Sequence, residues 1–435
     1  MPSRAANAAS DKRAGRVRRT LLATLAAALL AAFPGCRRRE PVQPTPQMDA
    51  APAFWIRVRI LNDVSECTLS ILSTSRLVSH VASTSEPIHL EPFEEPAPLR
   101  MHQGRIRIGD FLFQDTELSI FPDGPHIFEL NGRDYRGNLR LILDPDDNTF
   151  DAINWVPLEP YLAGVIGAEM PDYWESEALQ AQAIAARTYC LYIKNRFGAG
   201  RHWDVGKTQA HQVYRGIAAE SAQIWNAVNQ TGGQVLVAET HDGATDIFPT
   251  YYSSVCGGHT EDAEKVFGKS TQAIPGVPCP YCEDVARNEL FNWPEAQYGK
   301  REVSMRLQQR YPVLMNLQEI VEIVPIEQSH YPDFTRTTKF ELIGSSDQTD
   351  WLRAEDLRLT IDPTGMKIKS AAFEIADLGA RWGFRSGRGF GHGVGMCQCG
   401  AQGMAMLGRT AEQILAHYFP NSEIRSLYAP QDETL

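Results

Sequence analysis

One stretch of sequence decides the fold class of this 435-residue chain: Val156-Pro-Leu-Glu-Pro-Tyr-Leu-Ala-Gly-Val-Ile-Gly-Ala-Glu-Met-Pro171. Its apolar residues recur at the spacing of one face of an α-helix. Pro157 suits the first turn of a helix, and Pro171 marks its end. We therefore predict a short helix over residues 158–170, with Glu169 near its carboxyl-terminal end. The apolar residues of this face are Leu158, Tyr161, Leu162, Val165 and Ile166.

The segments on either side of this stretch differ in character. Residues 54–150 contain runs that partly alternate apolar and polar residues, such as Phe54–Leu61 and Ile106–Phe113, with turn signals between them. A second, alanine-rich helix is predicted from about Glu175 to Arg196. The sequence therefore predicts an α+β protein, in which a β-rich module at 54–150 is followed by a mixed helix and strand domain at 151–430.

The first 53 residues read as an export signal and a spacer. Residues 1–35 combine a basic start with a short apolar run, which is typical of a secretory signal. Residues 33–36, Phe-Pro-Gly-Cys, resemble a bacterial lipobox, so we expect lipidation at Cys36. Cleavage without a lipid and an uncleaved anchor are the alternatives. The Pro-rich residues 36–53 predict a semi-rigid linker. These features indicate an exported protein, periplasmic or otherwise outside the cytoplasm, that contacts the membrane only through this anchor.

Composition narrows the class of partner. Hydrophobic residues make up 43% of the chain, which is enough for a packed core. The formal net charge is −11, and no stripe rich in lysine and arginine lies outside the N-terminus. The sequence therefore argues against nucleic acid as a partner.

Glu169 is the candidate for acid–base chemistry. Partial burial at the edge of the apolar face and the negative end of the helix dipole would both raise the pKa of its carboxyl group. A raised pKa is what a carboxyl group needs to donate a proton near neutral pH. On spacing alone, an exposed glutamate without a role remains the alternative.

Five motifs in this chain resemble, in order, those of the SpoIID/LytB family. The similarity extends over roughly residues 130–430. The motifs lie at 156–171, 177–189 (Glu-Ala-Leu-Gln-Ala-Gln-Ala-Ile-Ala-Ala-Arg-Thr-Tyr), 212–216 (Gln-Val-Tyr-Arg-Gly), 256–261 (Cys-Gly-Gly-His-Thr-Glu) and 387–398 (Gly-Arg-Gly-Phe-Gly-His-Gly-Val-Gly-Met-Cys-Gln).

The resemblance implies a peptidoglycan lytic transglycosylase that prefers glycan strands stripped of peptides, with Glu169 as the catalytic acid. Such an enzyme uses the sugar's own 6-hydroxyl as nucleophile, so one carboxyl group suffices where hydrolytic glycosidases usually need two. No metal or organic cofactor is required for this chemistry. Another branch of the family is described as enhancing a cell-wall amidase, so a glycan-binding enhancer without activity is the alternative.

Five further residues are candidates for binding the glycan. Gln182 and Tyr189 share a helical face, and Arg187 could orient Glu169; a structural ion pair is the alternative for Arg187. His392 and Gln398 belong to a glycine-rich segment whose backbone could approach a ligand closely. A buried, hydrogen-bonded histidine in a tight turn is the alternative for His392.

Two close pairs of potential ligands indicate a structural zinc site. The alternative is a disulfide between Cys279 and Cys282, which an oxidising compartment favours. The sequence assigns no chemistry to Cys397 or Cys399, and it assigns no function to residues 295–350. The predicted zinc ligands are Cys256, His259, Cys279 and Cys282.

Overall fold

The computed structural model describes residues 54–79, 86–240, 243–268 and 271–427. The predicted signal at 1–35, the lipidation site Cys36 and the linker at 36–53 lie outside the described residues. Within the described ranges, no helix has the length and apolar character needed to span a membrane. The fold is α+β with a β-rich N-terminal region, as the sequence predicts.

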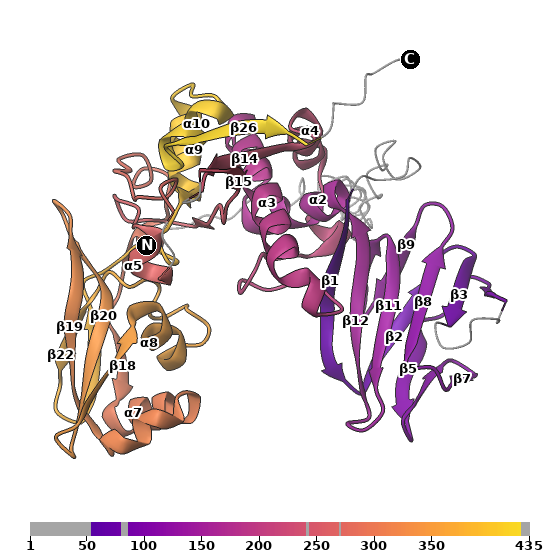
Figure 1. The fold of residues 1–435 in the computed structure, drawn as a ribbon, viewed down its shortest axis with the longest axis horizontal. Coiled ribbons are helices and arrows are strands. Elements are labelled where there is room, and N and C mark those ends of the chain that lie inside the picture. Colours follow the sequence, from indigo (N-terminus) through magenta and orange to yellow (C-terminus); the bar gives the residue numbers. More distant parts are fainter. Residues whose placement is uncertain (1–53, 80–85, 241–242, 269–270, 428–435) are drawn as a thin grey trace, which may run out of the picture. The chain divides into compact units, whose positions relative to one another are not determined.

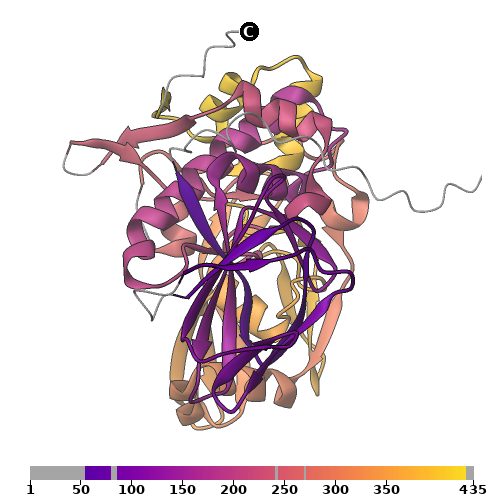
Figure 2. The ribbon, with the colours of Figure 1, turned by 90° about the vertical axis from the view of Figure 1, so that its right-hand side faces the viewer.

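Two sheets form the N-terminal region (Figures 1 and 2). The first has seven strands in the order β13 (Val205–Gly206), β1 (Trp55–Val64), β12 (Thr149–Pro157), β11 (Asn138–Asp144), β8 (Glu117–Pro122), β3 (Ser75–Ser79) and β4 (Ile88–Leu90). The second has six strands in the order β10 (Arg133–Arg136), β9 (Ile127–Leu130), β2 (Glu66–Ile71), β5 (Ala97–His102), β6 (Arg105–Ile108) and β7 (Phe111–Phe113). Because β9 contacts β11 and β10 contacts β12, the two sheets lie against each other.

The strand pattern follows the alternation seen in the sequence. In β1, Ile56, Val58 and Ile60 are buried and the residues between them are partly exposed. The segment 106–113, which the sequence suggests is one run, forms β6 and β7, because the chain turns at Gly109 with a φ of 57°. The division at residue 150 stays a prediction; that residue lies inside β12.

Strand β12 leads directly into α2 (Leu158–Glu169), and α3 (Ser176–Phe197) follows, which confirms both predicted helices. Helix α3 contacts α2, α4 (Ala222–Gln230), α9 (Gln398–Met406) and α10 (Ala411–Tyr418) (Figure 1). Its buried alanines leave room for these neighbours. A small sheet in the order β15 (Thr245–Ile247), β14 (Gln234–Glu239) and β26 (Ser422–Ser426) also packs on α3.

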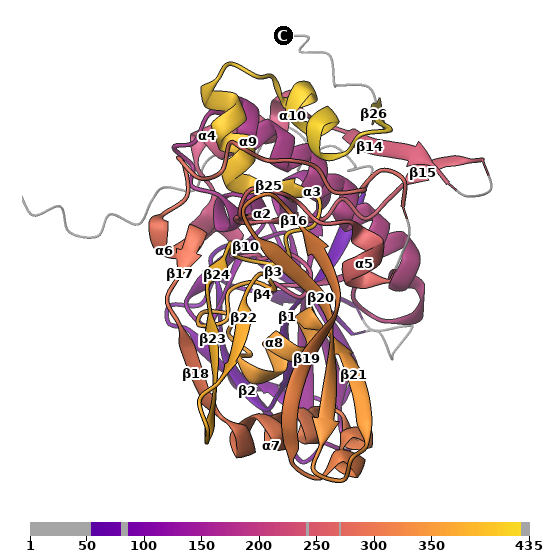
Figure 3. The same cartoon turned by 90° about the vertical axis from the view of Figure 1, so that its left-hand side faces the viewer.

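Residues 292–388 form a segment with a hydrophobic cluster of its own (Figure 3). Its ends pair as β17 (Asn292–Trp293) and β24 (Gly387–Arg388). Between them lie one sheet of β18 (Ala296–Gly299), β23 (Arg381–Arg385) and β22 (Glu374–Asp377), and another of β19 (Ile320–His330), β20 (Thr335–Gly344) and β21 (Thr349–Arg353). The helices of this segment are α7 (Lys300–Arg310), η4 (Pro312–Leu317) and α8 (Ala354–Ile361).

Short elements complete the region between α3 and this segment. Strand β16 (Tyr252–Ser253) pairs in parallel with β25 (Met396–Cys397), although more than 140 residues separate them. The remaining elements are η2 (Gly198–Gly200), η3 (Gly216–Ala219), α5 (Ala263–Phe267) and α6 (Asn288–Phe291).

Candidate functional site

Glu169 is the last residue of α2. Met170 leaves the helix in an extended conformation, with φ −132° and ψ 146°, while its N–H still donates to the Ile166 carbonyl. The following Pro171 explains this ending, because proline disfavours a helical conformation in the residue before it. The Glu169 side chain therefore projects from the helix end rather than from the middle of a packed face.

Two glycines of α2 admit the loop that touches Glu169. A Cβ on Gly164 would lie 2.4 Å from the ring of Tyr214, and one on Gly167 would lie 1.9 Å from the Ala219 carbonyl oxygen. Only glycine allows approaches this close. The N–H of Arg215 donates to the Gly164 carbonyl at 3.1 Å, which fixes the loop on the helix. The motif at 212–216 is thereby held beside the end of α2.

The Glu169 carboxyl group is partly buried and accepts a 2.7 Å hydrogen bond at Oε1 from the backbone N–H of Val213. Burial raises the pKa of Glu169, while this N–H, the Gln398 side chain and the Arg215 charge act in the opposite direction. Among the ion pairs of the described residues, none involves Glu169. Its carboxyl group is thus suited to holding a proton.

Gln212 and Tyr252 extend the polar surroundings of Glu169. The Tyr161 hydroxyl donates to Gln212 Oε1 at 3.0 Å, and Gln212 Nε2 donates to the Ala186 carbonyl and to the Tyr252 hydroxyl at 3.1 and 3.0 Å. Burial raises the pKa of Tyr252, and the nearby Glu169 charge raises it further. Neither residue is among the glycan contacts that the sequence predicts. Gln212 could have been found from its motif, whereas nothing in the local sequence marks Tyr252.

The pairing of β16 with β25 brings Gln398 to the same place. Tyr252 pairs with Met396, so α9 begins beside it with Gln398 as its first residue. Gln398 Nε2 donates to Gln182 Oε1 at 3.4 Å. The Nε2 atom of Gln182 is buried without a hydrogen-bond partner among the described residues. Of the predicted glycan contacts, Gln398 therefore adjoins Glu169 directly and Gln182 lies behind it.

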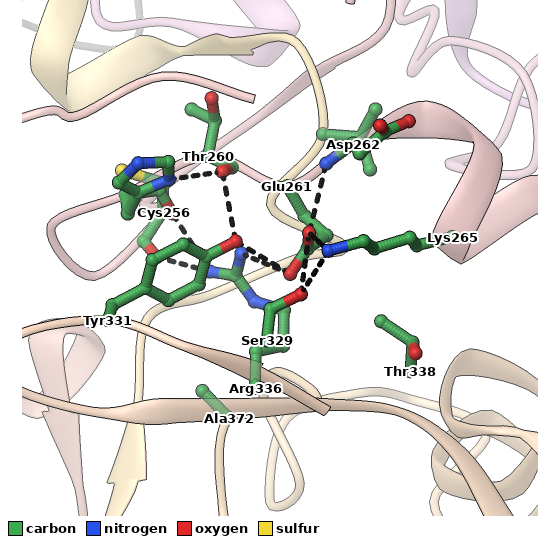
Figure 4. A network of polar contacts seen from close by, with 12 residues as sticks. Cys256, Thr260, Glu261, Asp262, Lys265, Ser329, Tyr331, Arg336, Thr338 and Ala372 are labelled. Carbon is green, nitrogen blue, oxygen red and sulfur yellow. Dashed lines mark hydrogen bonds and ion pairs between the residues drawn. The ribbon is translucent and has the colours of Figure 1, made fainter. Parts of the chain in front are cut away.

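A buried network holds the motif at 256–261 (Figure 4). The Glu261 carboxylate accepts hydrogen bonds from Tyr331 at 2.8 Å and Ser329 at 3.0 Å, and it lies 3.8 Å from the Arg336 guanidinium. Arg336 in turn donates to the carbonyls of Cys256 at 2.6 Å and His259 at 3.2 Å. Ser329 of β19, Tyr331 of the following loop and Arg336 of β20 thus fix this motif in place.

Known proteins resemble the chain over most of its length. The family described as SpoIID, Stage II sporulation protein, matches residues 146–237. An uncharacterised protein of Brachyspira hyodysenteriae is 33% identical over 297 residues, which are 68% of this chain and 74% of that protein. The Stage II sporulation protein D of Bacillus subtilis is 29% identical over 283 residues, covering 62% of this chain and 74% of that protein. The chain belongs to the SpoIID/LytB family.

A further member is the protein named Amidase enhancer of Bacillus subtilis, which is 25% identical over 376 residues and of which this chain covers half. Membership gives this SpoIID/LytB protein a cell-wall-related role. The α2 end, the loop at 212–216 and the start of α9 all come from motifs by which the sequence resembles this family.

Arg187 requires a correction. It was predicted to bind glycan or orient Glu169, but it is fully buried and donates to both oxygens of Glu159 at 2.9 and 2.6 Å. It also donates to the Gln234 carbonyl at 3.1 Å. Arg187 points away from the site because its helix turns this position toward α2 and β14. The structural ion pair is therefore the correct interpretation.

The rings of Tyr189 and His392 both contact the ring of Tyr251. The Tyr189 ring centroid is 5.9 Å from that of Tyr251, and the His392 ring centroid is 6.0 Å from that of Tyr251. The Val394 N–H donates to His392 Nδ1 at 3.0 Å. Burial lowers the pKa of His392 to about 4. A hydrogen bond to the Tyr252 backbone raises the pKa of His392 against this effect and links the ring to a residue beside Glu169, while its role toward glycan stays a prediction.

The predicted zinc ligands are brought together in part. The sulfur atoms of Cys256, Cys279 and Cys282 lie in one group with that of Cys397, which is not among the predicted ligands. His259 is not in the group. Its Nδ1 lies 2.6 Å from the Thr260 carbonyl, and its ring stacks on Tyr331. The predicted ligand set is therefore corrected at His259, because its ring stacks on Tyr331 and lies outside the group of sulfur atoms.

Proposed function

We propose that this protein is a lytic transglycosylase that cleaves the bond between N-acetylmuramic acid and N-acetylglucosamine in peptidoglycan strands. The observation that carries the proposal is the Glu169 carboxyl group. This group is partly buried and forms no ion pair within the described part of the chain, and burial raises its pKa. A carboxyl group in such surroundings can act as an acid near neutral pH.

Glu169 accounts for both proton transfers of the reaction. The protonated carboxyl group donates its proton to the glycosidic oxygen, and the bond from that oxygen to C1 of the muramic acid breaks. The resulting carboxylate then accepts the proton of the sugar's 6-hydroxyl, whose oxygen forms the new bond to C1. The products are a 1,6-anhydro sugar end and a free 4-hydroxyl. No water is consumed, so no second carboxylate is needed to activate one.

The groups around Glu169 have distinct tasks in this proposal. The Val213 N–H and the Gln398 side chain orient the carboxyl group and stabilise its carboxylate after the first transfer. Gln182 holds Gln398 from behind. Export of the protein with a lipid on Cys36 belongs to the same proposal, because the substrate lies outside the cytoplasm.

The alternative is a glycan-binding protein that stimulates an amidase without cutting. The similarity to the protein named Amidase enhancer supports this alternative. Both functions would use peptidoglycan as a partner, but only the first needs an acid at Glu169. A cell-wall amidase is then the expected second partner.

Mass spectrometry of purified glycan strands, with and without attached peptides, tests the proposal. The wild type should release anhydro-sugar ends, which lack one water relative to hydrolysis products. Glu169→Gln should lower their rate of formation by about 10²–10⁴-fold, the usual contribution of general acid–base catalysis. Glu322→Gln, at an exposed position of β19, is the control and should leave the rate unchanged. The proposal would be rejected if the wild-type protein released no anhydro-sugar ends and only stimulated an added amidase.

A further inference from the structure

Four thiols from three distant segments share one buried position. The sulfur atoms of Cys256, Cys279, Cys282 and Cys397 all lie within 4.8 Å of one another, and all four side chains are buried. The Cys256 and Cys282 sulfur atoms are 3.7 Å apart. Four sulfurs around a zinc ion at about 2.3 Å form a tetrahedron with edges of about 3.8 Å. A disulfide would instead place two sulfurs at about 2.0 Å.

Hydrogen-bond donors surround these sulfur atoms. Cys397 Sγ accepts from the N–H of Cys256 at 3.2 Å and from the N–H of Gly400 at 3.4 Å, in the first turn of α9. The Tyr418 hydroxyl lies 3.0 Å from Cys279 Sγ. Donors of this kind stabilise thiolates, which are the form that binds a metal.

Helix α9 packs closely against the group at Gly400. A Cβ on Gly400 would lie 2.5 Å from Cys279 Sγ and 2.0 Å from the Tyr418 hydroxyl oxygen. Only glycine at this position lets α9 approach the thiols so closely. The cysteine pair at 279 and 282 has the two-residue spacing common in structural zinc sites.

We propose that Cys256, Cys279, Cys282 and Cys397 bind one structural zinc ion as a tetrathiolate. All four positions are supplied by the protein, so the ion holds segments together and does not open a place for substrate. The site does not depend on whether Glu169 cuts glycan. It replaces His259 of the sequence-based ligand set by a cysteine more than 100 residues further along the chain.

The site joins the segments that build the surroundings of Glu169. Cys397 directly precedes Gln398, and Cys256 follows Tyr252 by four residues. The β16–β25 ladder between these segments has only two residues on each side. Because this ladder is short, a zinc ion would help to hold Tyr252 and Gln398 beside each other. The metal positions these residues and takes no part in the chemistry.

Metal analysis of the purified full chain tests the proposal. Zinc should be bound in an equimolar amount and should survive dialysis against a metal-free buffer. X-ray absorption at the zinc edge should show four sulfur neighbours at about 2.3 Å. This measurement on the wild type is independent of whether any variant folds. Chain that binds no zinc, binds iron instead, or has a disulfide within the group would overturn the proposal.

Variants distinguish the fourth ligand. Cys397→Ser should lose most of the zinc to a chelator under conditions in which the wild type retains it. Cys399→Ser is the matched control, because this buried cysteine lies two residues away and outside the group, and His259→Ala is the second control. Both controls should retain zinc. Loss of zinc in His259→Ala, together with a spectrum showing three sulfurs and one nitrogen, would refute Cys397 as the ligand.

Discussion

Replacing Arg187 by methionine would separate a structural role from glycan binding. The guanidinium group is fully buried, and its partner Glu159 has a side chain only 4% exposed. The two groups form a bidentate pair at 2.9 and 2.6 Å. Arg187→Met leaves the Glu159 carboxylate buried without its cation. Removing one partner of such a pair costs about 3–5 kcal/mol, so we expect the free energy of unfolding to fall by that amount.

Urea unfolding followed by circular dichroism measures the loss. Arg100→Met is the control, because Arg100 forms an exposed pair with Glu66 that should contribute about 1 kcal/mol or less. The double variant Arg187→Met/Glu159→Met removes both charges and should recover much of the stability lost in the single variant. If the protein is the proposed transglycosylase, the folded double variant should cleave glycan at the wild-type rate.

Two results would refute this reasoning. The first is a single variant as stable as the wild type that no longer binds or cuts glycan. The second is a double variant that regains its stability and remains inactive. Either result would return Arg187 to the group of substrate-binding residues.

Three further predictions concern the surroundings of α2 and the glycine-rich segment. Burial raises the pKa of Glu169 above its usual value of 4.5. Between the usual and the raised pKa the native protein binds more protons than the unfolded chain, so the free energy of unfolding falls as pH rises through this range. Glu169→Gln should therefore be at least as stable as the wild type at pH 8 in urea unfolding, and a less stable variant would contradict this. Gly167→Ala should lower the free energy of unfolding by about 1–3 kcal/mol, because its Cβ would overlap the Ala219 carbonyl. Gly200→Ala, where nothing lies within 4 Å of the new Cβ, is the control and should unfold like the wild type. The pKa of His392 is lowered to about 4 by burial, so NMR should find its ring neutral at pH 5.5, and folding stability should fall as pH drops below about 6.5, where the unfolded chain binds the proton. A ring that titrates near 6.5 in the native protein would contradict this.

The helices around Glu169 could be predicted because their signals are local. Pro157 and Pro171 bracket α2 in the sequence as they do in the structure, and α3 begins at Ser176, next to the predicted start at about Glu175. Periodicity also predicts strands such as β1, since its buried and partly exposed residues alternate. Each of these signals depends only on neighbouring residues.

The contacts that shape the site could not be predicted in the same way. Val213 acts through its backbone N–H, which no residue type reveals. Tyr252 and Cys397 enter through the two-residue pairing of β16 with β25, whose partners are far apart in the sequence. The spacing of Cys256 and His259 suggested a ligand pair, but the direction of the His259 ring is decided by Tyr331, which lies in another segment.

The pairing of β17 with β24 makes the chain return to the point at which it departed. Asn292 lies opposite Arg388, and the N–H of Gly389 donates to the carbonyl of Phe291 at 2.9 Å. Nearly a hundred residues with a core of their own therefore leave and rejoin the rest of the chain at adjacent positions. Changes in length within the parts of this segment that do not contact the motif at 256–261 need not alter where the chain resumes on the way to Gln398.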